Sequence, residues 1–300
     1  MSGTRGTIST STPMFIALGA TGRVGSAVAI ALLDGGEQVT VVTRDPRRAE
    51  PFARRSAAVA VADVRDADAL RAVLRRGRRA FLLMPPADPA GDTVVEERRA
   101  MQAIARAVDG AGLEKVVVLS TYGAQPGEAL GDLGVLHALE QAVAGTGVPT
   151  CVVRGAYFMS NWDFALELAR GEGVVPSLFP PDLALPMVAP ADLGRAAARW
   201  LVAEGEHAGV HHVEGPAAYS AADVARAASA ALGRDVRVVE TPRARWVETF
   251  RALGFSPSSA DSYARMTATV VDGAYERPEA PERGPTTLAE YVARRVRRGA

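Results

Sequence analysis

Short apolar runs alternate with amphipathic segments over the first half of this 300-residue chain. The apolar runs predict strands over 14–19, 38–44, 57–64, 80–86, 115–123 and 150–155. The amphipathic segments between them predict helices over 23–36, 66–76, 93–112 and 134–147. Because the strand-like runs are continuously apolar rather than alternating, each strand should be covered on both faces. This pattern predicts an α/β fold of the Rossmann type, with a doubly wound parallel sheet.

The pattern changes after Gly155, where aromatic residues and prolines become more frequent, as in "AYFMSNWDF" and "SLFPPDLALPMVAP". Helices are expected over 191–204, 220–233 and 243–254, and the end of the chain, "TTLAEYVARRVRR", is amphipathic. Strands are expected over 211–215 and 236–240.

The chain therefore divides into a Rossmann-type domain over 13–155 and a smaller α+β domain that makes up most of 156–300. We expect the strand over 211–215 to return to the first sheet, so that the two domains are interleaved. Residues 1–12 are polar and are expected to form a disordered leader.

Three glycines spaced three residues apart, Gly19, Gly22 and Gly25 in "GATGRVG", join the first strand to the first helix. A strand before them, a helix after them and a second strand next are the context of a dinucleotide-binding loop. The first glycine permits a tight turn, the second lets the backbone approach a pyrophosphate, and the third lets helix and strand pack closely. Helix amides would then face the phosphates, whereas the alternative is a purely structural turn. The expected cradle also includes Thr21, Arg23 and Val24.

The end of the second strand, "VVTRDP", bears on which dinucleotide binds. NAD sites usually place Asp or Glu there, whereas an arginine suits the 2′-phosphate of NADP. Arg44 therefore favours NADP(H) over NAD(H), and Arg23 could add positive charge. Asp45, one residue later, could instead bind a ribose hydroxyl. Asp63 and Val64 are placed to meet the adenine, although Asp63 could equally cap a helix.

Composition narrows the classes of function. The formal net charge is zero, which offers no long-range attraction to nucleic acid or to an anionic membrane. No apolar stretch approaches the ~20 residues of a membrane-spanning helix. A single cysteine, Cys151, excludes an internal disulfide and a multi-cysteine metal site, and no metal is expected. We expect a cytoplasmic monomer or homodimer that acts on a small molecule, with no nucleic-acid or membrane partner.

Five segments occur in the order "GATGRVG", "TRDP", "VVVLSTYGA", "HALEQAVAGTGVPTCVVRGAYFMSNW" and "APADLGRAAA". Together they resemble the NmrA-like family of atypical short-chain dehydrogenase/reductase proteins, which includes NADPH-dependent quinone reductases and isoflavone-reductase-like enzymes. The resemblance spans about residues 13–295. It implies that 13–155 bind the dinucleotide and that 156–300 mainly bind the substrate, but it leaves the substrate itself open, because one fold hosts many reactions.

Ordinary members of that superfamily use a Tyr-x-x-x-Lys pair, which this chain lacks. Its one lysine, Lys115, begins a strand, with no tyrosine four residues before it. In "LGVLH", Leu133 and His137 stand where the pair would be expected. The resemblance implies that His137 replaces the lysine, so that it contacts the nicotinamide ribose or donates a proton. The alternative is a helix histidine hydrogen-bonded near the surface.

Ser120, Thr121 and Tyr122 end the strand over 115–123, at the edge where ligands gather in open parallel sheets. We expect Ser120 and Tyr122 to take part in catalysis with His137, Tyr122 being the best remaining acid. Ser120, Thr121 and His137 are also expected to contact the cofactor. Simple capping of the strand end is the alternative.

Two further segments gain a role from the resemblance. Met84 and Pro85, which end a strand, would pack against the cofactor. The pocket over the nicotinamide would be lined by Tyr122, Tyr157, Phe158, Met159 and Asn161, with Tyr157 also touching the cofactor. For Phe158 and Met159, ordinary core packing is the alternative.

These expectations combine into an NADPH-dependent reductase of a small electrophilic carbonyl compound, such as a quinone or an enone. Two alternatives stay open. One is a non-catalytic NADP(H)-binding redox sensor of the NmrA kind, which the missing Tyr-x-x-x-Lys pair favours. The other is an epimerase or tailoring enzyme of a biosynthetic pathway.

Overall fold

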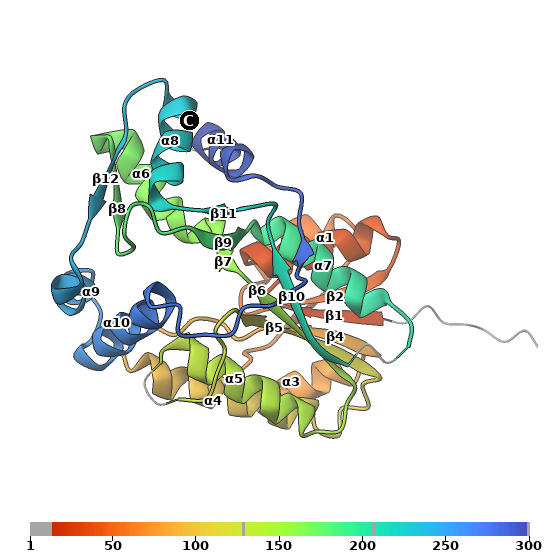
Figure 1. Cartoon of the computed structure of the whole chain (residues 1–300). Helices are drawn as coiled ribbons and strands as arrows, with labels where there is room; N and C mark the ends of the chain where they lie inside the picture. Colours follow the sequence, from red (N-terminus) through yellow and green to blue (C-terminus); the bar gives the residue numbers. More distant parts are fainter. Residues whose placement is uncertain (1–13, 128–129, 206–207, 299–300) are drawn as a thin grey trace, which may run out of the picture.

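The computed structural model describes residues 14–127, 130–205 and 208–298 (Figure 1). The leader expected over 1–12 lies outside these residues.

One large sheet of eight parallel strands forms the centre of the protein (Figure 1). Its order is β13-β10-β6-β5-β4-β1-β2-β3, so the direction of strand succession reverses between β1 and β4. The first five strands are β1 (Met14–Leu18), β2 (Gln38–Thr43), β3 (Ala58–Val61), β4 (Arg79–Leu82) and β5 (Lys115–Thr121). The other three are β6 (Thr150–Gly155), β10 (Gly209–Glu214) and β13 (Glu282–Arg283). Ligands of such sheets bind at the carboxyl ends of the strands near this reversal.

Helices cover both faces of this sheet, which confirms the predicted Rossmann-type fold (Figure 1). One face packs against α1 (Arg23–Asp34) and α7 (Pro190–Val202). The other face packs against α3 (Ala67–Leu74), α4 (Thr93–Val108) and α5 (Asp132–Ala144). The short helices η1 (Pro46–Ala49) and α2 (Glu50–Ala53) follow β2.

Close packing of α1 on α7 depends on a glycine in the segment "APADLGRAAA". A Cβ atom at Gly194 would lie 2.4 Å from the Cβ of Ala27 and 2.8 Å from the carbonyl oxygen of Val24. Real Cβ atoms do not approach other atoms this closely, so a larger residue would push the two helices apart. The glycine therefore fixes how α7 sits beside the helix that begins at the glycine loop.

The second domain contains two small sheets and the remaining helices. One sheet is formed by β7 (Tyr157–Phe158), β9 (Leu185–Val188) and β11 (Ala218–Tyr219), the other by β8 (Val174–Ser177) and β12 (Arg237–Glu240). Its first helices are η2 (Met159–Trp162), α6 (Asp163–Glu172) and α8 (Ala221–Leu232). They are followed by η3 (Arg243–Arg245), α9 (Trp246–Ala252), α10 (Pro257–Val271) and α11 (Leu288–Arg298).

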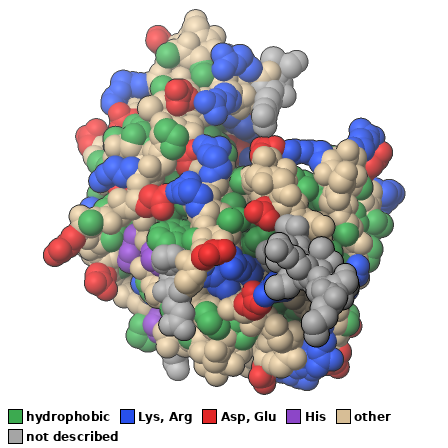
Figure 2. All heavy atoms as spheres, turned by 90° about the vertical axis from the view of Figure 1, so that its right-hand side faces the viewer, with side chains coloured by type: hydrophobic (Ala, Val, Ile, Leu, Met, Phe, Trp, Pro, Cys, Tyr) green, Lys and Arg blue, Asp and Glu red, His purple; other side chains and the backbone are tan. Residues whose placement is uncertain are grey.

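The chain crosses between the two domains several times. The strand expected over 211–215 is β10, and it pairs with β6 of the main sheet. After the second domain the chain returns once more as β13, which was not predicted, and then ends in α11. Charges of both signs are interspersed on the side of the molecule shown in Figure 2.

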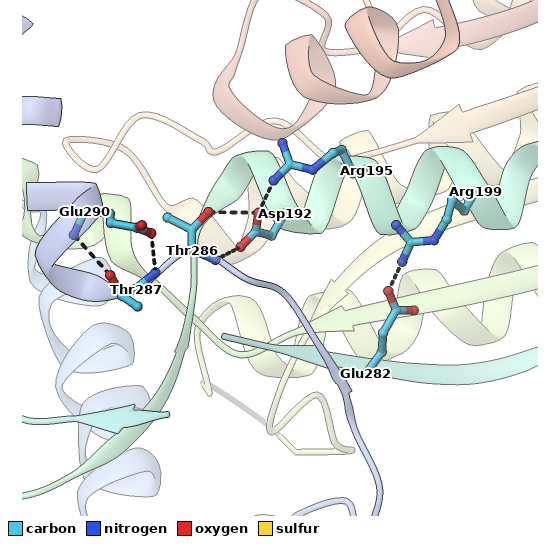
Figure 3. A network of polar contacts seen from close by, with 7 residues as sticks. All are labelled: Asp192, Arg195, Arg199, Glu282, Thr286, Thr287 and Glu290. Carbon is cyan, nitrogen blue, oxygen red and sulfur yellow. Dashed lines mark hydrogen bonds and ion pairs between the residues drawn. The ribbon is translucent and has the colours of Figure 1, made fainter. Parts of the chain in front are cut away.

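Residues 282–287, here called the C-terminal strap, are held to α7 by a buried carboxylate (Figure 3). Asp192 accepts hydrogen bonds from the backbone amide of Thr286 at 2.8 Å and from its hydroxyl at 3.0 Å, and it pairs with Arg195. Along the same helix, Arg199 pairs with Glu282 of β13. The strap therefore anchors both the last strand of the main sheet and the start of α11.

Several predicted elements are shorter in the structure. The strand expected over 80–86 ends at Leu82, before Pro85, because proline has no amide hydrogen for a sheet ladder. The strand expected over 57–64 ends at Val61, and the helix expected over 93–112 ends at Val108. The residues released after β3 and β4 lengthen the loops at the carboxyl edge of the sheet, whereas those released after α4 lie at the opposite edge, before β5.

Candidate functional site

The glycine loop has the geometry of an anion cradle. Gly19 adopts a φ of +63°, and the amide of Gly22 donates to the carbonyl oxygen of Gly19 at 2.8 Å, which closes a tight turn. A Cβ atom at Gly25 would lie 2.3 Å from that same oxygen. Gly22 caps α1 without a side-chain hydrogen bond, and the first turn of α1 contains no acidic residue. The amides of this turn therefore remain available, and the loop fits the diphosphate of a dinucleotide.

Three arginines follow β2 beside this loop. Arg48 donates to the carbonyl oxygen of Thr21 at 3.1 Å and so braces the cradle, a contact that the sequence analysis missed. Arg47 pairs with Asp45, whose carboxylate also accepts from the Arg47 amide at 3.0 Å and caps η1. Arg44 is exposed and makes no hydrogen bond or ion pair with residues that the structure describes. Of the three arginines, only Arg44 has a guanidinium without a hydrogen bond or ion pair to the described residues. Asp45 is already bound by Arg47.

Asp63 and Val64 follow β3 at the same edge. Asp63 pairs with Arg65 at 2.8 Å and accepts from the Arg65 amide at 3.0 Å. The hydrogen bond from Arg65 holds the pKa of Asp63 below its usual value, and the nearby charge of Arg44 lowers it further. Asp66, not Asp63, caps α3. Val64 is half-buried and faces the core between the sheet and its helices.

Arg23 does not reach toward the end of β2. Its guanidinium pairs with Asp163, a buried residue at the start of α6. Asp163 also pairs with Arg295 at 3.2 Å and accepts a hydrogen bond from the Tyr291 hydroxyl at 2.7 Å, both from α11. The expectation that Arg23 adds charge around the 2′-phosphate is therefore not supported. Instead, Arg23 joins the glycine loop to α6 and α11.

A polar cluster lies between α5 and the strands β5 and β6, and we call it the Glu140 cluster: Ser120, His137, Glu140 and Arg154. Ser120 and Arg154 are direct neighbours in the parallel register of β5 and β6. The Ser120 hydroxyl donates to Oε1 of Glu140, and Ser120 is only 1% exposed. Ser120 is thus committed inside the protein rather than free to contact a substrate. His137 is the half-buried member of the cluster, with Nδ1 3.9 Å from Oε2 of Glu140.

Tyr122 does not have the surroundings of a proton donor. Its hydroxyl donates to Oε1 of Glu214 at 3.2 Å, and Arg283 lies 3.2 Å from the other oxygen of that carboxylate. The ring packs edge-on against His212. Burial raises the pKa of Tyr122 far above its usual value, and the charge of Glu214 adds to this. This arrangement does not favour the expected role of Tyr122 as an acid, because a carboxylate partner and burial both hold its proton in place.

The segment after β6, which was predicted to line the substrate pocket, is divided between core and surface. Met159 is fully buried in the core of the second domain, which matches the alternative of ordinary core packing rather than a place in the substrate pocket. Tyr157 is half-buried, edge-on to Phe179 at 5.3 Å, and burial raises the pKa of Tyr157 to about 12. Phe158 packs against the core of the first domain, and Asn161 is exposed.

The remaining predicted contacts, Thr121, Met84 and Pro85, are half-buried at the ends of β5 and β4. The structure thus gathers the glycine loop and the ends of β2, β3, β4 and β5 at one edge of the sheet. Lys115 lies at the opposite edge. Its ammonium donates to the carbonyl oxygen of Ala203 at 2.7 Å, where it caps α7, and burial lowers the pKa of Lys115.

A pair of carboxyl groups, the buried Glu97 and the half-buried Asp132, joins α4, α5 and α10 and was also missed by the sequence analysis. Glu97 is 1% exposed and accepts from the amide of Ala87 at 3.3 Å. Burial, with the nearby charge of Asp132, raises the pKa of Glu97 to about 8. The Tyr263 hydroxyl of α10 lies 3.5 Å from Asp132. This pair and further hydrogen bonds, such as that from the Gly131 amide to Ser262 at 2.8 Å, dock α10 on the loops after β4 and β5.

Two properties of the described residues bear on other kinds of site. They contain no group of three or more histidine, cysteine, aspartate or glutamate side chains arranged to hold a metal ion. None of the helices they form is both long and apolar enough to cross a membrane.

Curated proteins similar to this chain include two bacterial reductases. An NAD(P)H azoreductase of Xenophilus azovorans is 26% identical over 286 residues, which cover 93% of this chain and 96% of that protein. A (4-alkanoyl-5-oxo-2,5-dihydrofuran-3-yl)methyl phosphate reductase of Streptomyces griseus is 32% identical over 230 residues, which cover 76% of this chain and 77% of that protein.

Solved structures share the whole fold. An NADPH-dependent quinone oxidoreductase of Escherichia coli, in complex with NADPH, superposes with a TM-score of 0.77 at 22% identity, covering 94% of this chain and 99% of that one. A triphenylmethane reductase of Citrobacter sp. superposes with a TM-score of 0.78 at 17% identity, covering 95% and 99%. The family model described as the NmrA-like family matches residues 13–291. The chain belongs to the NmrA-like family.

Proposed function

We propose that this protein is an NADPH-dependent reductase of small conjugated electron acceptors of the quinone or enone type. At the level of reaction class, the protein is an NAD(P)H-dependent oxidoreductase. Relatives are named as an NAD(P)H azoreductase and as a reductase, and the chain belongs to the NmrA-like family.

The proposal rests on two features at the same edge of the sheet: the glycine loop, and the guanidinium of Arg44, which makes no hydrogen bond or ion pair with the described residues. The loop offers amides to a diphosphate, and the Cβ approach at Gly25 leaves no room for any residue but glycine. Arg44 is exposed at the end of β2, where a 2′-phosphate would lie, and Asp45 is engaged by Arg47. NADP(H) is therefore preferred over NAD(H).

The residues near the proposed nicotinamide position suit an acceptor that needs little acid catalysis. A bound NADPH supplies two electrons and a proton as hydride. Tyr122 and Ser120 are committed to carboxylates, and Lys115 lies at the far edge of the sheet. His137 is then the remaining proton donor among the predicted catalytic residues. The chain's main contribution would be to hold the two reactants in a fixed orientation.

The names of the relatives point to the same class of acceptor. Azo compounds, quinones and the dihydrofuranone named for the Streptomyces relative, whose ring alkene is conjugated with carbonyl groups, all delocalise added electron density. Such molecules do not need a strong acid beside the reacting atom. We extend this shared property, rather than any single substrate, to the present protein.

The test is NADPH oxidation followed by absorbance with a panel of quinones, enones and azo compounds. Turnover with at least one class, and weaker activity with NADH, is the expected result. If calorimetry shows that NADPH binds but no member of the panel is reduced, the reductase proposal is wrong and a redox sensor becomes the better reading. If neither dinucleotide binds, both are wrong.

A further inference from the structure

Glu140 is a buried carboxylate whose contacts converge from three elements. It is 3% exposed, and it lies on α5 beneath His137. Arg154 of β6 donates to both of its oxygens, at 2.9 Å from Nε and 2.6 Å from Nη2, and Ser120 of β5 donates to Oε1. A buried carboxylate is costly unless paired, and this two-point pairing with an arginine fixes its position.

The imidazole of His137 faces this carboxylate. Its Nδ1 atom is buried and has no hydrogen-bond partner among the described residues. Oε2 of Glu140 lies 3.9 Å from it, and the two residues are three positions apart on the same helix, so helix geometry keeps them together. Closing this gap by about 1 Å would give an ordinary hydrogen bond.

We propose that Glu140 is a positioning residue for His137: its fixed carboxylate accepts the Nδ1–H and so selects which ring nitrogen carries the proton. This leaves Nε2 as the atom presented to the bound ligand, whether ribose hydroxyl or substrate oxygen. The role that His137 then plays rests on the proposed function, whereas the choice of tautomer does not.

The arrangement is more than a structural ion pair. Arg154 and Ser120 already satisfy the carboxylate, so the packing of α5 on the sheet does not require a histidine at position 137. The unsatisfied Nδ1 is the one polar atom of the Glu140 cluster that is left buried without a hydrogen bond. A buried polar atom in that state calls for an explanation, and a hydrogen bond from Nδ1 to Glu140 would supply one.

The first test reads the tautomer directly and needs no turnover. The protein is labelled with ¹⁵N-histidine, and the signals of His137 are assigned by their loss in His137→Gln. In the wild type, neutral His137 should carry its proton on Nδ1. In Glu140→Gln it should revert to the Nε2–H form, because the carboxamide can donate to Nδ1. An Nε2–H form in the wild type, or the same tautomer in both proteins, would overturn the proposal.

A second variant keeps the test valid if Glu140→Gln does not fold. Glu140→Asp keeps the charge that Arg154 needs but withdraws the carboxylate by one methylene, so the preference for the Nδ1–H form should weaken without vanishing. If Glu140→Gln does not fold, this variant decides the question: an unaltered tautomer population counts against the role of Glu140.

A double-mutant cycle on kcat with the best quinone or enone extends the test to function. Glu140→Gln should lower kcat by about 10-fold with little change in KM, as removal of a group that orients a functional histidine does. That loss should disappear in a His137→Gln background.

The matched control is Asp192→Asn, which changes the buried carboxylate of α7 that holds the C-terminal strap. Its effect on kcat should add to that of His137→Gln. Equal losses from Glu140→Gln in both backgrounds would show a merely structural role. If no substrate is turned over, the proposed function fails while the tautomer test still stands.

Discussion

Replacing Arg44 by alanine tests the choice between NADP(H) and NAD(H). Arg44 is exposed and makes no hydrogen bond or ion pair with the described residues, although its charge is felt by the nearby Asp63, so its guanidinium can turn to a 2′-phosphate. Arg47, three residues later, is a matched control, because it is also exposed but already pairs with Asp45. We expect Arg44→Ala to weaken NADPH binding and to leave NADH binding unchanged.

The size of the effect follows from charge and distance. Two unit charges about 4 Å apart attract by about 1 kcal/mol in water, and a phosphate monoester carries about 1.5 to 2 negative charges at neutral pH. The loss of Arg44 should therefore cost about 1.5 to 2 kcal/mol, which is about a 10- to 30-fold rise in the Kd for NADPH. Salt should shrink this difference, because exposed charges are screened over about 10 Å at 0.1 M ionic strength.

Isothermal calorimetry with NADPH and NADH at low and high salt measures both quantities. Arg47→Ala should change the Kd for NADPH much less than Arg44→Ala does. The reasoning is refuted if Arg44→Ala weakens both dinucleotides equally, or if Arg47→Ala has the larger effect.

Three further predictions concern the loop, the tyrosine and the buried acid. Gly25→Ala places a Cβ 2.3 Å from the Gly19 oxygen, so it should destabilise the fold by about 1 to 3 kcal/mol in urea titrations and abolish dinucleotide binding. Tyr122→Phe should change kcat by far less than the ~10²-fold or more expected on loss of a general acid, and a loss of that size would restore Tyr122 as the acid. Because Glu97 has its pKa raised to about 8 from 4.5, folding binds a proton between these values, and wild-type stability should fall as pH rises through this window. Glu97→Gln should remove most of that decline, and parallel stability–pH curves would contradict the assignment.

The fold of the first domain could be predicted because its signals are local. Each strand is a continuous apolar run, and the loop after β1 needs glycine for reasons confined to seven residues, as the positive φ of Gly19 and the close approach at Gly25 show. The second domain was harder to predict. Its strands β7 and β11 are two residues long, and α10 is docked by hydroxyl and carboxyl contacts to loops far away in the sequence.

The sequence predicted which edge of the sheet carries the candidate site, but not which side chains pair there. Those partners come from segments far away in the sequence. Arg23 meets Asp163, and Tyr122 meets Glu214, and neither pairing leaves a pattern in the sequence. Met159 looked like a pocket residue in an aromatic segment, but it is part of the core. The one missed contact that sequence could have supplied is Glu140 beside His137, since their spacing of three places them on one helical face.

The return of β10 and β13 to the main sheet has a consequence for how the chain folds. A fragment that stopped at residue 155 would leave β6, with its fully buried Cys151 and Val153, as an unpaired edge of the sheet. Unpaired edges of this kind recruit other chains, so such a fragment should aggregate instead of folding. Because β10 and β13 pair with the main sheet from positions far along the chain from β6, many of its contacts are long-range, and refolding should be slow for its length.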